Sequence, residues 1–347
     1  MSAPPSASPS ALPPLSVLDL SPIVEGSNAA EALRNSLDLA RHCEALGYQR
    51  YWVAEHHNMD GVASSATSVL IGYLAAGTRS IRVGSGGVMV PNHAPLVIAE
   101  QFGTLATLYP NRIDLGLGRA PGTDQLTMRA LRRTLATQTE DDFIGDVVEL
   151  AEYFDPPADE RRPANPVRAI PGIGCDVPIW LLGSSLYSAQ VAAHLGYPFA
   201  FASHFAPAML MQALQIYRAR FRPNGKPGAL TKPHAMVAVN VVCADSDDEA
   251  AYLFTSLQQR FLGMQTGKRG PLPKPIPVAE MNALGSPAER AGMEQMLTVT
   301  AVGAPATVRA RLNQIVEQTQ ADELIIAGAV HDHAARKRSY ELLAGIG

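Results

Sequence analysis

Two adjacent histidines, His56 and His57, are the residues of this sequence that are best suited to acid–base chemistry. They follow a short apolar run, in the order Glu-His-His-Asn, and therefore stand at the end of an expected strand. Neighbouring residues of a strand point to opposite sides, so only one of the two rings can face a given pocket. A neutral imidazole in that position would act as a general base near neutral pH. The sequence is equally compatible with two rings that form structural hydrogen bonds.

A glycine-rich run, residues 84–87 with the sequence Gly-Ser-Gly-Gly, follows another expected strand. Glycine lets a backbone approach a flat ligand closely, so this run would form a pocket wall without side chains and suit an aromatic ring system. Tight turns between strands and helices also use glycine, so the run alone is weak evidence. No Gly-x-Gly-x-x-Gly pattern follows the first expected strand, which argues against a Rossmann dinucleotide site.

Three serines, Ser184, Ser185 and Ser188, lie where an expected strand passes into a helix. The amide groups and the dipole at a helix N-terminus bind anions, and serine hydroxyls add hydrogen-bond donors. Arg119, at the end of another expected strand, has the fork geometry for a bidentate contact to a phosphate. Taken alone, these residues fit an ordinary serine cap and a surface arginine better than an anion site.

A metal site would need further ligands beside the histidine pair. His331 and His333 offer the spacing of such ligands, but they precede a helix rich in Arg and Lys. Asp332 between them is better suited to cap that helix. We therefore predict that the chain has no metal site.

The composition excludes several classes of protein. Lys and Arg number 28 against 32 Asp and Glu, a net charge of −4, so no basic excess exists for nucleic-acid binding. No apolar run reaches the roughly 18 residues that span a membrane. Residues 1–14, rich in Pro, Ser and Ala, lack the features of a signal peptide and predict a flexible tail. The three separated cysteines, Cys43, Cys175 and Cys243, predict reduced thiols in a cytoplasmic protein.

Short apolar runs alternate with segments of helical period along the chain. We expect strands at residues 15–20, 51–54, 81–85, 113–117, 178–182, 199–202, 236–244 and 324–327. We expect helices at residues 28–46, 65–76, 95–108, 125–150, 185–195, 208–221, from 247 onward, 305–319 and 333–343. This alternation requires a parallel sheet, and eight units favour a closed (β/α)8 TIM barrel over an open sheet.

We predict a single barrel domain over residues 15–347, with insertions at residues 154–175 and 263–285. The second insertion contains the run PLPKPIP and is expected near the barrel mouth, as a mobile lid or an inert surface loop. Active sites of such barrels lie at the carboxyl ends of the strands. The histidine pair, the glycine run, Arg119 and the serines all follow expected strands, and so they gather at that end.

Four motifs, in the same order along the chain, resemble the bacterial luciferase-like flavin-dependent monooxygenases. They are YWVAEHHN, RVGSGGVMVPNHAPLVIAEQFGTLATLYPNRIDLGLGRAPG, PIWLLGSSLYSA, and VGAPATVRARL followed by ADELIIAG. The similarity extends from about residue 15 to the C-terminus, and its long second block and its Glu-His-His run are quite specific. The family fold is a (β/α)8 barrel, in agreement with the strand count.

Position by position, the resemblance implies a site for FMN. His56 matches the family's catalytic histidine, near the reactive edge of the flavin. Ser85, Gly86 and Gly87 match the wall beneath the flavin ring, where the family often has a non-prolyl cis peptide bond at the position of the two glycines. The residues implied to bind the flavin phosphate are Arg119, Ser184, Ser185 and Ser188.

Two departures from bacterial luciferase itself concern the pocket. That enzyme has a reactive cysteine near the position of Gly118 and a bulkier residue near that of Gly86. Glycine at both positions predicts a wider pocket and a different substrate. Nothing in the sequence indicates light emission.

The implied function is a monooxygenase that receives reduced FMN from a separate flavin reductase. Oxygen would add to the reduced flavin to give a peroxide, with His56 as base or hydrogen-bond donor and the second insertion as a lid that excludes water. The expected substrate is a small apolar molecule of the carbonyl type, such as an aldehyde or ketone. We expect a homodimer, although the small residues at 65–76 suit a subunit interface and packing within the barrel equally well.

Three alternatives remain from the sequence. The same fold would serve a hydride-transfer enzyme that uses a flavin or a deazaflavin. A non-catalytic protein that stores or carries flavin would show the same binding residues. A metal-dependent hydrolase of the same fold is a minor alternative.

Overall fold

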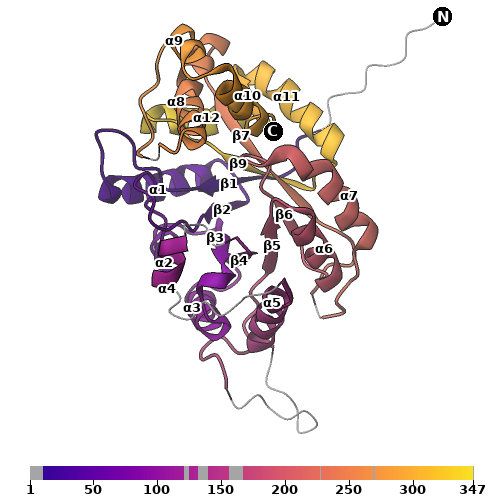
Figure 1. The fold of residues 1–347 in the computed structure, drawn as a ribbon. Helices are drawn as coiled ribbons and strands as arrows, with labels where there is room; N and C mark the ends of the chain where they lie inside the picture. The colour runs from indigo at the N-terminus through magenta and orange to yellow at the C-terminus, as the bar shows by residue number, and fades with distance from the viewer. Residues whose placement is uncertain are drawn as a thin grey trace, which may run out of the picture.

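Eight parallel strands close into a barrel in the computed structural model, which describes residues 11–120, 125–131, 140–155, 167–226, 228–268 and 270–346 (Figure 1). Strands β1 to β6 pair in chain order, β6 pairs with β7, β7 with β9, and β9 with β1. The strands are β1 Leu15–Asp19, β2 Arg50–Val53, β3 Arg82–Met89, β4 Ile113–Gly118, β5 Ile179–Gly183, β6 Phe199–Phe201, β7 Ala235–Cys243 and β9 Glu323–Ala327. The predicted (β/α)8 barrel is confirmed.

The helices surround the barrel and connect its strands (Figure 1). They include α1 Ala29–Ala45, α2 Thr67–Gly77, α3 Pro95–Leu108, α4 Gln125–Leu131, α5 Glu140–Phe154, α6 Leu186–Leu195, α7 Leu210–Arg220, α8 Asp247–Gln265, α11 Pro305–Thr319 and α12 His333–Ala344. Local signals set their ends: Asn28 caps α1 by accepting a hydrogen bond from the Glu31 N–H at 3.0 Å. No helix among the described residues is long and apolar enough to cross a membrane.

The predicted elements differ from the structure in two places. A ninth strand, β8 Thr300–Gly303, was not expected; it pairs only with the distal part of β7, from Asn240 to Cys243, and lies outside the closed barrel. The single helix predicted at residues 125–150 corresponds to α4 and α5, and residues 132–139 between them lie outside the described part. Residues 1–10 of the predicted tail and 156–166 of the first insertion lie outside it as well.

The second insertion is folded against the barrel. It contains α9 Val278–Ala283, is followed by α10 Pro287–Met296, and groups with α8 (Figure 1). Its extended part pairs with the loop after β1, where the Leu272 N–H donates to the Ile23 carbonyl at 2.8 Å and the Glu25 N–H to the Leu272 carbonyl at 2.9 Å. Gly270 also lies against Gly61, in the loop that follows β2. The insertion therefore covers the loops at the carboxyl ends of β1 and β2.

The barrel interior is filled by side chains rather than open. Trp52 and Trp180 meet edge to face, with ring centroids 5.2 Å apart. The other buried members of this inner cluster are mostly small or aliphatic: Leu18, Ala54, Ala200, Met236, Ala238 and Ile325. Because the middle of the barrel is packed, chemistry on a ligand is confined to one of its ends.

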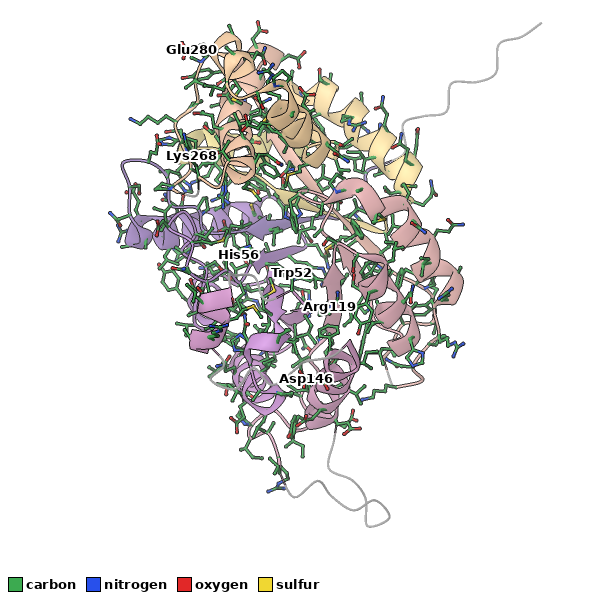
Figure 2. All side chains as sticks on the ribbon, in the orientation of Figure 1. Trp52, His56, Arg119, Asp146, Lys268 and Glu280 are labelled. Carbon is green, nitrogen blue, oxygen red and sulfur yellow. The ribbon has the colours of Figure 1, made fainter. Side chains whose placement is uncertain are left out.

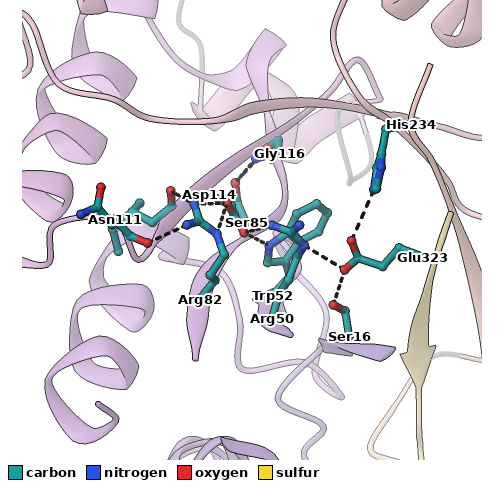
Figure 3. Close-up of polar contacts among 11 residues, drawn as sticks. Ser16, Arg50, Trp52, Arg82, Ser85, Asn111, Asp114, Gly116, His234 and Glu323 are labelled. Carbon is teal, nitrogen blue, oxygen red and sulfur yellow. Dashed lines mark hydrogen bonds and ion pairs between the residues drawn. The ribbon is translucent and has the colours of Figure 1, made fainter. Parts of the chain in front are cut away.

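A buried network of charges closes the amino end of the barrel (Figure 3). Asp114 Oδ2 lies 2.9 Å from Arg50 Nη1, and Asp114 Oδ1 lies 2.6 Å from Arg82 Nη2. Arg50 Nε also lies 2.8 Å from Glu323 Oε1, which accepts a further hydrogen bond from the Ser16 hydroxyl. Each of these residues lies in the first half of its strand. Asp114 and Glu323 are almost fully buried, and each is held by at least one guanidinium.

Candidate active site

His56 stands in the loop that follows β2, at the carboxyl end of the barrel. Its N–H donates to the Ser64 carbonyl at 3.0 Å, and the Ser64 hydroxyl donates to the Ala54 carbonyl. These bonds close residues 54–64 into one loop that carries the histidine pair. In Figure 2, His56 and Arg119 lie on either side of Trp52, the buried side chain beneath the mouth.

The side chains of the two adjacent histidines have different surroundings, as the strand geometry predicted. His57 Nε2 lies 2.9 Å from Glu55 Oε1, and His93 Nε2, from the loop after β3, lies 2.8 Å from the same oxygen. Burial alone would raise the pKa of Glu55, but hydrogen bonds from His93, His57 and the Met89 N–H outweigh it and hold that pKa below its usual value. The Glu55 carboxylate thereby ties the β2 loop to the β3 loop.

The ligand atoms of Glu55, His57 and His93 lie within 4.8 Å of one another, a spacing that would admit a metal ion. Both imidazole nitrogens are at hydrogen-bond distance from one carboxylate oxygen, so hydrogen bonding accounts for the grouping. The absence of a metal stays a prediction.

His331 and His333 lie apart from this group. His331 Nε2 lies 3.2 Å from the Glu25 carbonyl, and His333 Nε2 lies 2.9 Å from Asp38 Oδ2. Asp332 caps α12 by accepting a hydrogen bond from the backbone three residues further on, as predicted. The two histidines therefore flank the α12 cap at Asp332 and contact Glu25 and Asp38 instead of each other.

His204 follows β6 and therefore stands at the carboxyl end of the barrel, on the side opposite to β2. Strands β2 and β6 are four places apart in the cycle of eight, so their ends lie across the barrel from each other. Burial and, secondarily, the charge of His56 lower the pKa of His204 to about 4. The two rings therefore lie close enough for the charge of one to affect the protonation of the other. Sequence reasoning placed His204 after a strand but did not select it.

The glycine run forms the β3–β4 side of the site. The peptide bond between Gly86 and Gly87 is cis, as the resemblance implied. A Cβ on Gly86 would lie 2.7 Å from Leu18 Cδ1, and one on Gly87 would lie 2.7 Å from the Gly116 carbonyl oxygen, so a larger residue would displace its neighbours. Ser85 donates to the Gly116 carbonyl at 2.8 Å and accepts from the Gly116 N–H at 2.9 Å. Its hydroxyl thus joins β3 to β4, and direct contact of Ser85 with a cofactor stays a prediction.

Arg119 and the serine turn lie together. The Arg119 guanidinium carbon is 4.3 Å from the ring centroid of Tyr187, the second residue of α6. Ser185 is the N-cap of α6 in extended backbone conformation, but its hydroxyl makes no capping hydrogen bond. The Ser185 side chain therefore does not cap the first turn of α6, and the N-terminus of a helix is a place where proteins bind anions.

Ser184 and Ser188 differ in what their hydroxyls do. Ser184 is half-buried at the end of the β5 turn. Ser188 is buried, and its hydroxyl donates to the Ser185 carbonyl at 2.9 Å. A Cβ on Gly183 would lie 2.0 Å from Ser188 Oγ, so the strand end and the helix start are in direct contact. Ser188 thus shapes the turn, while contact of any of the three serines with a phosphate stays a prediction.

A closed parallel barrel with two histidines at its carboxyl end, and with an arginine beside the first turn of α6, has the layout of a barrel enzyme with its site at that end. The sequence model of the luciferase-like monooxygenases matches residues 14–323. The chain belongs to this family, and it is accordingly an oxidoreductase of the monooxygenase type.

Individual relatives agree with this assignment. A luciferase-like monooxygenase of Escherichia coli strain K12 is 58% identical over 327 residues, which are 94% of this chain and 95% of the relative. The N-acetyl-S-alkylcysteine monooxygenase of Bacillus subtilis is 39% identical over 257 residues, 74% of this chain and 75% of that protein. The crystal structure of apo-MsnO8 superimposes with a TM-score of 0.86 at 38% identity, and the match covers 96% of this chain and 98% of that one.

Proposed function

We propose that the chain is an FMN-dependent monooxygenase that takes reduced FMN from a separate flavin reductase and uses O2 to oxygenate a small organic substrate. The observation that carries this proposal is the position of Arg119 over Tyr187, in the first turn of α6, on the same barrel end as His56. A phosphate monoester is the part of FMN that an arginine beside a helix N-terminus would hold.

The residues present fit this cofactor. The phosphate would lie between Arg119 and the first turn of α6, with the Ser184 and Ser185 hydroxyls as further donors. The flavin ring would lie along the β3–β4 side, where side chains are missing at Gly86, Gly87 and Gly118. When bound, reduced FMN supplies the electrons and the reaction with oxygen.

The protein's own part in the chemistry falls to His56 and to the groups that hold it. His56 would hold or move a proton at the reacting edge of the bound flavin, as a base or a hydrogen-bond donor. Glu55 fixes His57 and His93 and thereby the loop from which His56 extends. The second insertion, seated on the loops after β1 and β2, would keep water from this edge.

The proposed substrate is a small, largely apolar carbonyl compound such as an aldehyde or ketone. A thioether is the main competing class, because the Bacillus subtilis relative is named for N-acetyl-S-alkylcysteine. A direct comparison is N-acetyl-S-methylcysteine against a straight-chain aldehyde.

The test is single-turnover oxygenation under 18O2. The protein is mixed with photoreduced FMN and one substrate, and the product is analysed by mass spectrometry. We expect one 18O atom in the product from the wild type and a loss of about 100-fold or more in rate for His56→Ala. The matched control, His194→Ala on the exposed end of α6, should keep full activity. Absence of 18O with both substrates, or a His56→Ala variant as active as the control, would contradict the proposal.

For the assembly, we propose a homodimer that uses α2 and α3. These helices expose apolar side chains: Val69, Tyr73, Val97 and Leu108. Such a patch fits burial against a second copy. Sedimentation equilibrium should give twice the mass of the chain, and Val69→Lys combined with Leu108→Lys should give the mass of one.

A further inference from the structure

His204 is held in a fixed position at the end of β6. The Asn240 side-chain amide, from β7, donates to the His204 carbonyl at 2.6 Å. The neighbouring Ser203 hydroxyl donates to the Ala238 carbonyl, also on β7, at 2.6 Å. The ring of His204 meets the ring of Phe205 edge to face, with centroids 4.9 Å apart. Strand β7 therefore anchors the backbone on either side of the imidazole, and Phe205 limits how the imidazole turns.

The two ring nitrogens of His204 are not equivalent. Nδ1 is enclosed by protein and has no hydrogen-bond partner among the residues the structure describes. An enclosed N–H without an acceptor costs more than an enclosed lone pair, so the proton of the neutral ring belongs on Nε2. Nε2 likewise forms no hydrogen bond within the described ranges, but it is not among the enclosed atoms, and His204 as a residue is half-buried. It is the nitrogen that a ligand in the mouth would meet.

The charge state of the ring supports the same assignment. The lowered pKa, about 4, keeps His204 neutral at physiological pH. His56 faces it from the β2 loop, so protonation of both rings would place two cations in one site. The ring therefore offers a single N–H donor and no positive charge, so it can bind an acceptor oxygen but cannot form an ion pair with a carboxylate or donate to an ammonium group.

We propose that His204 is a substrate-binding residue, whose Nε2–H donates a hydrogen bond to an uncharged acceptor oxygen of the substrate at the side of the mouth opposite to His56. This inference rests on the proposed function for the placement of the substrate in the mouth. The inference adds two points. The substrate has an uncharged acceptor oxygen, and His204 makes the protein bind that substrate more tightly than a compound of the same shape that lacks the oxygen.

The test compares two substitutions that keep an amide in place of the ring. In His204→Gln the amide nitrogen falls near the position of Nε2, whereas in His204→Asn it falls near that of Nδ1. The probe is cyclohexanone, with methylenecyclohexane as the analogue of the same shape that lacks the oxygen. Binding is followed by NMR of protein labelled with 15N in histidine for the wild type, and by amide shifts for the variants.

For the wild type, we expect the Nε2–H tautomer and a shift of the His204 Nε2 resonance with cyclohexanone but not with methylenecyclohexane. His204→Gln should stay within about threefold of the wild-type Kd for cyclohexanone, and His204→Asn should weaken binding about tenfold. His194→Gln, on the exposed end of α6, serves as the control and should match the wild type.

A protonated Nδ1, equal Kd values for the Gln and Asn variants, or equal affinity for the two probes would overturn the inference. These measurements need neither reduced FMN nor oxygen. A failure here together with 18O incorporation would reject the role of His204 alone, whereas binding as expected without 18O incorporation would reject the oxygenation and leave this subsite standing.

Discussion

The two ends of the barrel both carry polar side chains, but they use them differently. At the amino end, Asp114 and Glu323 are buried and held by Arg50 and Arg82 at 2.6 to 2.9 Å (Figure 3). At the carboxyl end, the N-cap serine of α6 makes no capping bond, and the ring nitrogens of His204 make no hydrogen bond within the described part of the chain. At the amino end the carboxylates of Asp114 and Glu323 are paired within the protein, whereas at the carboxyl end the ring nitrogens of His204 have no partner within the described ranges.

We therefore expect the amino end of the barrel to contribute mainly to stability and the carboxyl end mainly to ligand binding. A closed network stabilises the fold only while every member is present, because removal of one partner leaves a buried charge unpaired. An open donor at a mouth costs the free protein some stability and is satisfied when a ligand binds. Substitutions at the amino end should therefore change unfolding, and those at the carboxyl end should change binding.

The largest effect on stability is expected for Asp114→Asn at the amino end. The change leaves Arg50 and Arg82 without one of their anionic partners, and the free energy of unfolding should fall by about 3–5 kcal/mol. Urea unfolding monitored by circular dichroism measures it. The exposed pair of Lys226 and Asp155, at 2.6 Å, provides the control, and Asp155→Asn should cost less than about 1 kcal/mol. Equal effects of the two substitutions would remove the distinction between the network and a surface ion pair.

A smaller effect, on binding instead of unfolding, is expected for Arg119→Ala at the carboxyl end. Loss of the guanidinium should weaken FMN binding about 10- to 100-fold, because the contact to the phosphate is a charge-assisted hydrogen bond. Fluorescence titration measures the Kd. Riboflavin, which lacks the phosphate, is the matched control ligand, and its Kd should be the same for wild type and variant. A parallel loss for riboflavin would place Arg119 at the ring instead of the phosphate.

The smallest effect concerns the pH dependence of stability at the carboxyl end. Because the pKa of His204 is lowered to about 4 from an ordinary value of 6.5, the unfolded chain binds the proton more readily than the folded one between these values. Stability contributed by the neutral ring is therefore present above pH 6.5 and lost as the pH falls towards 4. In His204→Leu, the decrease in unfolding free energy from pH 7 to 5.3 should be about 1.5 kcal/mol smaller. Parallel curves for wild type and variant would show that this ring titrates normally.

Most of the barrel followed from the sequence because each strand is a compact apolar run followed by a helix with its own end signals, as in Asn28 and Glu31 of α1. Strand β8 was missed because four residues, Thr-Ala-Val-Gly, carry little periodicity and gain their order from the edge of β7. Helices α9 and α10 were not predicted, because the first lies within a proline-rich segment and the second follows it. Proline is nevertheless suited to a helix start, and the capping box of Ser286 and Glu289 was a usable signal.

The candidate site was predictable where a residue type and its position in a motif were enough, as for His56, Arg119 and the two glycines of the cis peptide bond. It was not predictable where the partner lies far along the chain. His93 is 38 positions from Glu55, and the pair forms only because the β2 and β3 loops meet. The sequence likewise showed the three serines without the direction of their hydroxyls, so the internal bond of Ser188 was not anticipated.

The most direct test of the account is a crystal structure of the chain with FMN bound. We expect the phosphate within hydrogen-bond distance of Arg119 and the first amides of α6, and the reactive edge of the flavin beside His56. The amino-end network of Asp114, Arg50 and Glu323 should be unchanged. A phosphate bound by Arg50 or Arg82 at the amino end, or a flavin outside the mouth, would contradict the division of the barrel into a closed end and a binding end.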